Sequence, residues 1–398
     1  MALPLRSIVL IGLTALAVAM GIGRFAFTPL MPLMLRDATL DAATGAEWAA
    51  ANYVGYLAGA LSAAWFSQQP RRGLMLGLAG VALSTLGMAL ADMSLPWLGG
   101  LLRGVAGVGS AWVLVCASSW CLPELARRQA TSLGGWMYTG VGIGIAVTGV
   151  IAWLGGQQSA LTLWWELGLL ALVGAGLVQW WLPATSRFAD TANQAPPVLS
   201  DTPTSTRRPL GLVLCYGAFG YGYIVPATFL PTMARQLVDD PLVFGLTWPL
   251  FGLAAALSVA GASRWLAGWP RRRVWALAQA VMAAGTLIPV LEHSLWALAC
   301  SAVLVGGTFM VATMAGLQLA REQMPTHPTP LLSRMTAAFA LGQIAGPLWV
   351  RLLGSFDVSP AIALNWANGL ATTLLIATAV WLWRGTFASR NPDEWIPT

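Results

Sequence analysis

The chain has 398 residues, of which 57% are hydrophobic and only 9% are charged. Soluble domains carry about 25% charged residues, so this composition excludes an ordinary soluble protein and indicates an integral membrane protein. The net charge of +6 does not indicate nucleic-acid binding, because the arginines stand at the ends of apolar runs rather than on one polar face. The two histidines and four cysteines form no metal-binding pattern, so we expect no metal site and no cofactor.

Apolar runs long enough to cross a bilayer as helices of about 20 residues follow one another along the chain. The first run continues past Arg24 to Leu35, longer than the apolar core of a signal peptide, so we interpret it as an uncleaved helix. The twelve predicted helices span residues 7–35, 47–67, 73–91, 95–121, 130–154, 160–182, 210–234, 241–267, 274–291, 295–319, 331–353 and 359–383.

A polar segment rich in Ser, Thr, Asp and Pro, residues 183–209, divides the chain near its middle. It is predicted to be a cytoplasmic linker between an N-terminal six-helix bundle (1–182) and a C-terminal six-helix bundle (210–398). Arginines gather in the loops on the side of the N-terminus and are sparse in the opposite loops. The positive-inside rule therefore places both termini in the cytoplasm, as expected for a multi-pass protein of a bacterial inner membrane.

The two halves repeat one another in sequence. The motif Pro32-x-Met34-x-Arg36 recurs as Pro231-x-Met233-x-Arg235, at an offset of 199 residues. Gly21-x-Gly23 recurs as Gly220-x-Gly222 at the same offset, and further pairs recur at an offset of 200. A nearly constant register over several helices indicates a duplication, and six spans per half give both halves the same topology.

Three segments resemble a known family. They read GIGRFAFTPLMPLM from residue 21, NYVGYLAGAL from residue 52 and FALGQIAGP from residue 339. Together they resemble the YbfB/YjiJ-like branch of the major facilitator superfamily, and the resemblance runs over the whole chain. It implies an all-α membrane protein with 12 transmembrane helices in two pseudo-symmetric six-helix bundles, and transport by alternating access. It does not imply a substrate.

Two superfamily signatures have counterparts here. The pattern R-x-x-x-G-x-G-x-A from Arg103 to Ala111 resembles the fourth-helix signature with its buried arginine. Arg71 and Arg72 resemble the basic gating loop, but Ser67 stands roughly where that loop has its acidic residue. The resemblance therefore does not extend to an Asp–Arg lock. The fifth helix lacks the Gly-Pro of the antiporter signature, so export is not implied either.

Arg24 and Arg103 lie well inside predicted spans, where a charge costs roughly 2.5–3.5 kcal/mol unless it faces a cavity or a partner. Either arginine caps helix carbonyls, or it binds solute. Glu166 is the one carboxylate expected to enter the membrane, which makes it the candidate for proton coupling. With two buried cations and no central carboxylate, the sequence favours an anionic or carboxylate-bearing substrate.

Uncharged polar side chains complete the predicted binding site. Tyr138, Tyr221 and Tyr223 lie too deep to be interfacial anchors, so they either line the cavity or pack in the core. Asn52 and Gln343 either bind solute or join helices by hydrogen bonds. In the 199-residue register Arg24 corresponds to Tyr223, so we expect an asymmetric site with a charged N-terminal side and an aromatic C-terminal wall.

The predicted gating residues lie at helix ends and at close helix contacts. Small residues let helices approach closely, and without a βαβ context the glycines of the fifth helix do not indicate a dinucleotide loop. Paired prolines are expected to bend the first and seventh helices at corresponding positions. The set is Arg71, Arg72, Arg271, Arg272, Pro29, Pro32, Pro226, Pro231, Gly140, Gly142 and Gly144.

The sequence thus predicts a secondary transporter, expected to be a monomer in the lipid bilayer, that moves a small anionic solute with protons as a candidate coupling ion. The alternative is a proton-coupled exporter of drugs or toxic metabolites. Lacking Lys, the chain cannot form a P-loop, which excludes ATP-driven pumping by this chain. An intramembrane enzyme would need paired His, Asp or Glu at depth, and a sensor would need a soluble output domain, so neither is expected.

Overall fold

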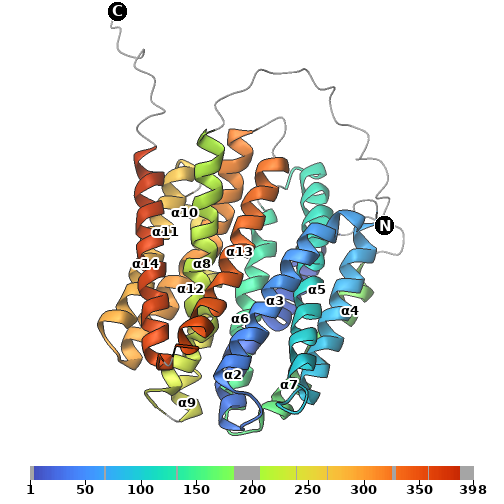
Figure 1. The fold of residues 1–398 in the computed structure, drawn as a ribbon. Coiled ribbons are helices and arrows are strands. Elements are labelled where there is room, and N and C mark those ends of the chain that lie inside the picture. The colour runs from blue at the N-terminus through green and yellow to red at the C-terminus, as the bar shows by residue number, and fades with distance from the viewer. Residues whose placement is uncertain are drawn as a thin grey trace, which may run out of the picture.

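The computed structural model describes residues 4–66, 69–130, 133–182, 207–238, 240–266, 268–324, 329–356 and 358–385. Residues 183–206 of the predicted linker lie outside these ranges, and Arg207 already belongs to a helix. Helices make up both halves of the described chain (Figure 1).

The N-terminal half begins with one long crossing, Leu5–Arg36, that is built from three consecutive helical pieces. These are α1 (Leu5–Leu16), the π-helix η1 (Ala17–Arg24) and α2 (Phe27–Arg36). The other helices of this half are α3 (Ala42–Ser62), η2 (Ala63–Phe66), α4 (Pro70–Gly87), η3 (Met88–Leu90), α5 (Pro96–Arg127), α6 (Gly134–Leu154) and α7 (Ala160–Trp181).

The C-terminal half repeats this order. Its helices are α8 (Arg207–Arg235), α9 (Pro241–Phe244), α10 (Thr247–Trp265), α11 (Arg271–Leu291), α12 (Leu295–Gln323), α13 (Thr329–Gly354) and α14 (Pro360–Arg384). The helix predicted over 241–267 is divided into α9 and α10. Proline has no N–H, so Pro249 cannot donate the helical hydrogen bond to residue 245, and this contributes to the division.

Ten helical segments of the described chain are long and apolar enough to cross a membrane. The remaining two crossings of the predicted twelve are α3 and α10, of which α10 holds only a shorter apolar stretch. Both pack across the middle of the molecule, α3 against α13 and α10 against α6.

The two bundles lie side by side, with both ends of the chain at the same end of the molecule (Figure 1). They are joined at the opposite end. There Glu47 at the start of α3 forms an ion pair with Arg351 near the end of α13, and the Trp153 indole N–H donates to the Leu242 carbonyl at 2.7 Å. The structure is therefore closed at the end away from the termini.

Candidate functional site

The site begins with a break in the first crossing. In η1 the backbone is π-helical, and the Phe25 N–H donates to the Met20 carbonyl five residues earlier at 3.0 Å. Pro29 has no N–H to continue the helical ladder, so the helix restarts only at Phe27. Short π-helical segments often mark functional positions. Arg24 is the last residue of η1, immediately before the break.

Arg103 of α5 stabilises this break. Its guanidinium is buried and donates to the carbonyls of Gly23 at 3.1 Å and Arg24 at 2.8 Å. Asn52 of α3 donates to the carbonyls of Gly23 at 3.3 Å and Arg103 at 2.9 Å. Of the two roles open to Arg103 and Asn52, the contacts therefore favour capping and interhelical bonding: both hold backbone carbonyls and so fix the position of Arg24.

Arg24 is different, because its guanidinium faces the junction of the two bundles. Its side chain is only 3% exposed, and it donates from Nη2 to the Tyr223 hydroxyl of α8 at 3.1 Å. The guanidinium also lies over the Tyr56 ring, 4.1 Å from the ring centroid, a favourable cation–π arrangement. Its Nε has no hydrogen-bond partner. Among the described residues, no carboxylate lies within 4.0 Å of it.

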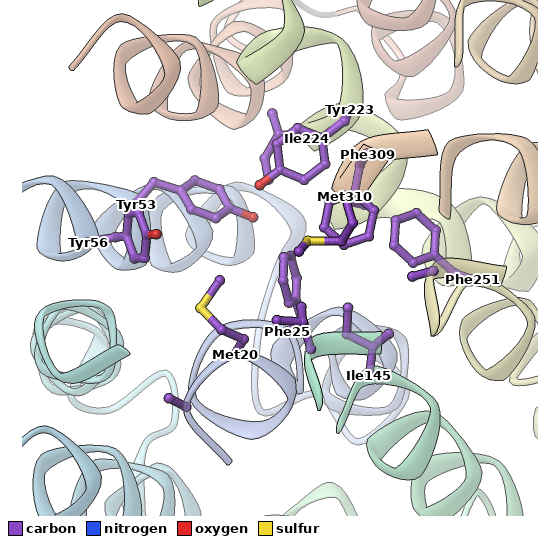
Figure 2. Close-up of a cluster of buried hydrophobic side chains, with 14 of the residues drawn as sticks. Met20, Phe25, Tyr53, Tyr56, Ile145, Tyr223, Ile224, Phe251, Phe309 and Met310 are labelled. Carbon is purple, nitrogen blue, oxygen red and sulfur yellow. The ribbon is translucent and has the colours of Figure 1, made fainter. Parts of the chain in front are cut away.

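Aromatic rings form the opposite wall. The Tyr223 ring is stacked between Phe309 and Phe339, with ring centroids 5.5 Å apart and planes 7° apart in each pair. Gln343 of α13 donates its side-chain N–H to the Tyr223 hydroxyl, so this oxygen accepts from two donors. Figure 2 shows Tyr53 and Tyr223 pointing toward one another from the two bundles. The aromatic C-terminal wall expected from the sequence thus faces Arg24, whose buried side chain crosses from the N-terminal bundle to Tyr223.

Two of the side-chain hydrogen bonds between the bundles join residues that correspond in the 199-residue register of the duplication. Arg24 and Tyr223 are 199 residues apart, and so are Thr28 and Ala227, whose side-chain hydroxyl and carbonyl are bonded at 2.7 Å. Symmetry-equivalent positions contact one another only near the symmetry axis. Pro231 explains the second bond: without an N–H it leaves the Ala227 carbonyl, four residues earlier, free to accept from Thr28. The first and seventh crossings therefore meet on the pseudo-twofold axis.

Several other predicted site residues lie elsewhere. Tyr221 donates to the Ala367 carbonyl of α14 at 3.5 Å, within its own bundle. Tyr138 is half-buried and shares a hydrogen bond of 2.9 Å with Ser118 of the same bundle. Glu166 is exposed on α7 and forms none of the cross-bundle contacts described here. The structure does not bring these three residues to Arg24.

The predicted gating arginines lie at the end of the molecule that carries the termini, and two of them, Arg271 and Arg272, contact residues of their own half. Arg271 lies 3.9 Å from Glu322, and Arg272 donates to the Leu382 carbonyl at 2.9 Å. Arg71 is half-buried and Arg72 is exposed at the start of α4. Pro29 and Pro32 lie in α2, and Pro226 and Pro231 lie inside α8, where the bundles meet.

The three predicted glycines of α6 do not share one partner. A Cβ at Gly140 would lie 2.2 Å from the Leu13 carbonyl oxygen, and one at Gly144 would lie 2.3 Å from that of Ala17, both in the first crossing. A Cβ at Gly142 would lie 2.4 Å from the backbone nitrogen of Ala256 in α10. Gly142 alone of the three therefore borders the other bundle.

Residues that sequence reasoning missed complete the surroundings of Arg24. Tyr53 of α3 shares a hydrogen bond of 2.9 Å with Thr228 of α8, and Tyr56 carries the closest cation–π contact. Phe25 lies between Trp248 and Phe309, at centroid distances of 6.2 and 6.3 Å. The position of Tyr53 and Tyr56 next to Asn52, at helical spacing, was the available signal.

Known proteins are similar to this chain in part of its sequence or in its fold. The family model described as "Uncharacterised MFS-type transporter YbfB" matches residues 16–382. The 3-(3-hydroxy-phenyl)propionate transporter of Escherichia coli (strain K12) is 33% identical over 118 residues, covering 29% of this chain and 28% of that protein. The class D tetracycline resistance protein of Salmonella ordonez is 31% identical over 146 residues, covering 36% of each. The chain thus spans only about a third of the length of these curated relatives.

The crystal structure of the D-xylose–proton symporter superposes with a TM-score of 0.74 at 12% identity, covering 95% of this chain and 97% of that one. At this identity the likeness speaks for the fold alone. It confirms the predicted all-helical architecture of twelve crossings in two bundles.

Proposed function

Because this chain belongs to the YbfB-type family of major facilitator transporters, we propose that it carries a small anionic solute by alternating access, with Arg24 binding the negative group. The observation that supports this proposal is a buried guanidinium on the pseudo-twofold axis with an aromatic neighbour and a phenol partner, and with no carboxylate of the described chain within 4.0 Å. An arginine keeps its charge when buried. A buried charge without a counter-ion is costly, so a carboxylate that pairs with it gains more than it would in water.

Alternating access requires that contacts between the bundles break and form. Four of these contacts are Glu47 with Arg351, Trp153 with Leu242, Thr28 with Ala227 and Tyr53 with Thr228. They lie between Arg24 and the end away from the termini, or at that end. A solute would therefore reach Arg24 from the side that carries the termini, which the arginine distribution assigns to the cytoplasm.

The alternative, a proton-coupled drug exporter, has less support. The partial match to a tetracycline resistance protein favours it. Against it, Glu166 is exposed on α7, so it supplies no carboxylate at the junction for a proton or a cationic drug. The other partial relative carries, by its name, a carboxylate. The proposed recognition of an anion by Arg24 therefore does not depend on proton coupling through Glu166.

The first test is Arg24→Gln. We expect organic anions to raise the thermal unfolding temperature of the purified wild-type protein and to be taken up by proteoliposomes, and we expect Arg24→Gln to abolish both effects. Arg384→Gln, at an exposed arginine at the end of α14, is the matched control and should respond as wild type does. Stabilisation of the wild type by lipophilic cations, with no response to any anion, would favour the exporter instead.

The second test is Tyr223→Phe. In the closed structure the Tyr223 hydroxyl accepts from the group that is proposed to bind solute, so it competes with an anion for Arg24. A hydrogen bond to a charged group is worth about 1.5–3 kcal/mol, so removal of this competitor is expected to tighten anion binding by about tenfold or more. Titration calorimetry measures it. Weaker binding would instead make the hydroxyl a direct contact of the bound solute.

A further inference from the structure

Resting on the proposed function, we infer that the substrate is a monocarboxylate with an aromatic body. The number of available charges gives the first half of this inference. Two arginines, Arg24 and Arg103, are buried near the break in the first crossing. Both terminal nitrogens of Arg103 already donate to backbone carbonyls, those of Gly23 and Arg24. Of these two, only Arg24 directs a guanidinium nitrogen across the junction, to Tyr223.

Arg24 supplies one positive charge directed to the junction, and this charge can pair with one negative charge of a solute. A dicarboxylate or a phosphate dianion would bring a second negative charge. Of the two buried arginines that the structure describes near the break, Arg103 has both terminal nitrogens bonded to backbone carbonyls, so the second charge would find no guanidinium donor directed to it, and such a buried charge is costly. An amino acid would bring an ammonium group. Among the described residues no carboxylate lies within 4.0 Å of the Arg24 guanidinium, so that ammonium would have no counter-ion.

The surroundings of Arg24 give the second half. Its guanidinium lies 4.1 Å from the Tyr56 ring centroid, 5.3 Å from that of Phe25 and 5.5 Å from that of Tyr53. Across the junction stand Tyr223, Phe309 and Met310, and on the side of Arg24 Met20 lies between Tyr56 and Phe25 (Figure 2). A planar aromatic body can stack against such rings and methionine sulfurs, and each aromatic pair adds to the effect of buried area.

A sugar or another polyol does not fit these surroundings. The side-chain donors nearest the break are already bonded to protein: the Asn52 amide donates to two carbonyls, and the Ser110 hydroxyl shares its one proton between the carbonyls of Ala19 and Ala106. The Asn52 Oδ1 and Gln343 Oε1 atoms have no hydrogen-bond partner among the described residues, so a polyol would find acceptors here but few donors. A polyol would bury hydroxyl groups against rings that return few hydrogen bonds, which is unfavourable. The walls therefore accept an apolar ring, and the single cation accepts its carboxylate.

The test is a panel of closely matched probes measured by titration calorimetry on the full chain in detergent. The reference probe is 3-phenylpropionate. Its amide removes the charge, 3-cyclohexylpropionate removes the aromatic ring, phenylsuccinate adds a carboxylate and phenylalanine adds an ammonium. We expect 3-phenylpropionate to bind at least about tenfold more tightly than the amide, the diacid and the amino acid. We expect it to bind at least about threefold more tightly than the cyclohexyl acid.

Two variants separate the two halves of the inference. Arg24→Gln should remove the preference for the acid over its amide. Phe25→Leu should reduce the preference for the aromatic over the cyclohexyl acid and leave the preference for the acid over the amide. If acids bind through Arg24 but the cyclohexyl acid or the diacid binds as well as 3-phenylpropionate, the inference is wrong and the proposed function stands. If none of the acids binds more tightly than the amide, the proposed function itself fails.

Discussion

Replacement of Arg103 by leucine is expected to abolish transport and to destabilise the fold by about 1–3 kcal/mol. Arg103 is 3% exposed and donates to two buried carbonyls at the break that follows η1. Without it the Arg24 carbonyl loses this donor, and each buried polar group left unsatisfied costs about 1–3 kcal/mol. The break would relax, and Arg24 would no longer be held toward Tyr223.

The variant Arg103→Lys tests whether Arg103 positions the backbone at the break or binds the solute directly. A lysine ammonium lacks the planar fork that reaches both carbonyls, so it should restore part of the thermal stability and part of the transport. Thermal unfolding in detergent and uptake by proteoliposomes, normalised to inserted protein, measure the two effects. Arg36→Leu is the matched control, because Arg36 also donates to backbone carbonyls, those of Gly156 and Gln158, far from η1. An Arg103→Leu protein that keeps wild-type stability and loses only anion binding would make Arg103 a direct binding residue.

Depth in the membrane could be predicted from the sequence, but rotation about the helix axis could not. Tyr221 and Tyr223 lie at similar depth, yet two residues are about 200° apart on a helix, so only Tyr223 faces the axis while Tyr221 bonds to α14. Glu166 shows the same limit. Thr162 and Leu169, which share its helix face at spacings of four and three residues, are also exposed, so Glu166 lies on the exposed face of α7.

The duplication predicted which residues correspond, and the structure adds which of them meet. The register pairs Arg24 with Tyr223 and shows that the charge is not repeated. It cannot show that this pair lies on the axis, because most equivalent positions in a duplicated protein are far apart. Likewise, two buried arginines look alike in sequence. Only the break between η1 and α2, with its two carbonyls, distinguishes Arg103 as the capping residue from Arg24.

Gly142→Val is expected to hold the bundles apart and to lower the transport rate by at least about tenfold. A side chain there would meet the Ala256 backbone nitrogen at 2.4 Å, and the contact is reciprocal because a Cβ at Gly252 would lie 2.3 Å from the Ala146 nitrogen. Backbone atoms within an α-helix cannot yield as a flexible side chain can, so α6 and α10 would have to separate. Each bundle can keep its own packing while they do, so the thermal stability should fall only modestly.

Gly144→Val provides the comparison. Its side chain would meet the Ala17 carbonyl oxygen at 2.3 Å within the same bundle, so the expected loss is of thermal stability first. The distinguishing readout is crosslinking by a short bis-maleimide between Glu47→Cys and Arg351→Cys, positions whose native side chains form a cross-bundle ion pair in the closed structure. Gly142→Val should reduce crosslinking in folded protein, whereas the fraction of Gly144→Val that stays folded should crosslink as the parent does. Equal crosslinking in both variants would mean that the contact between α6 and α10 does not control closure at this end.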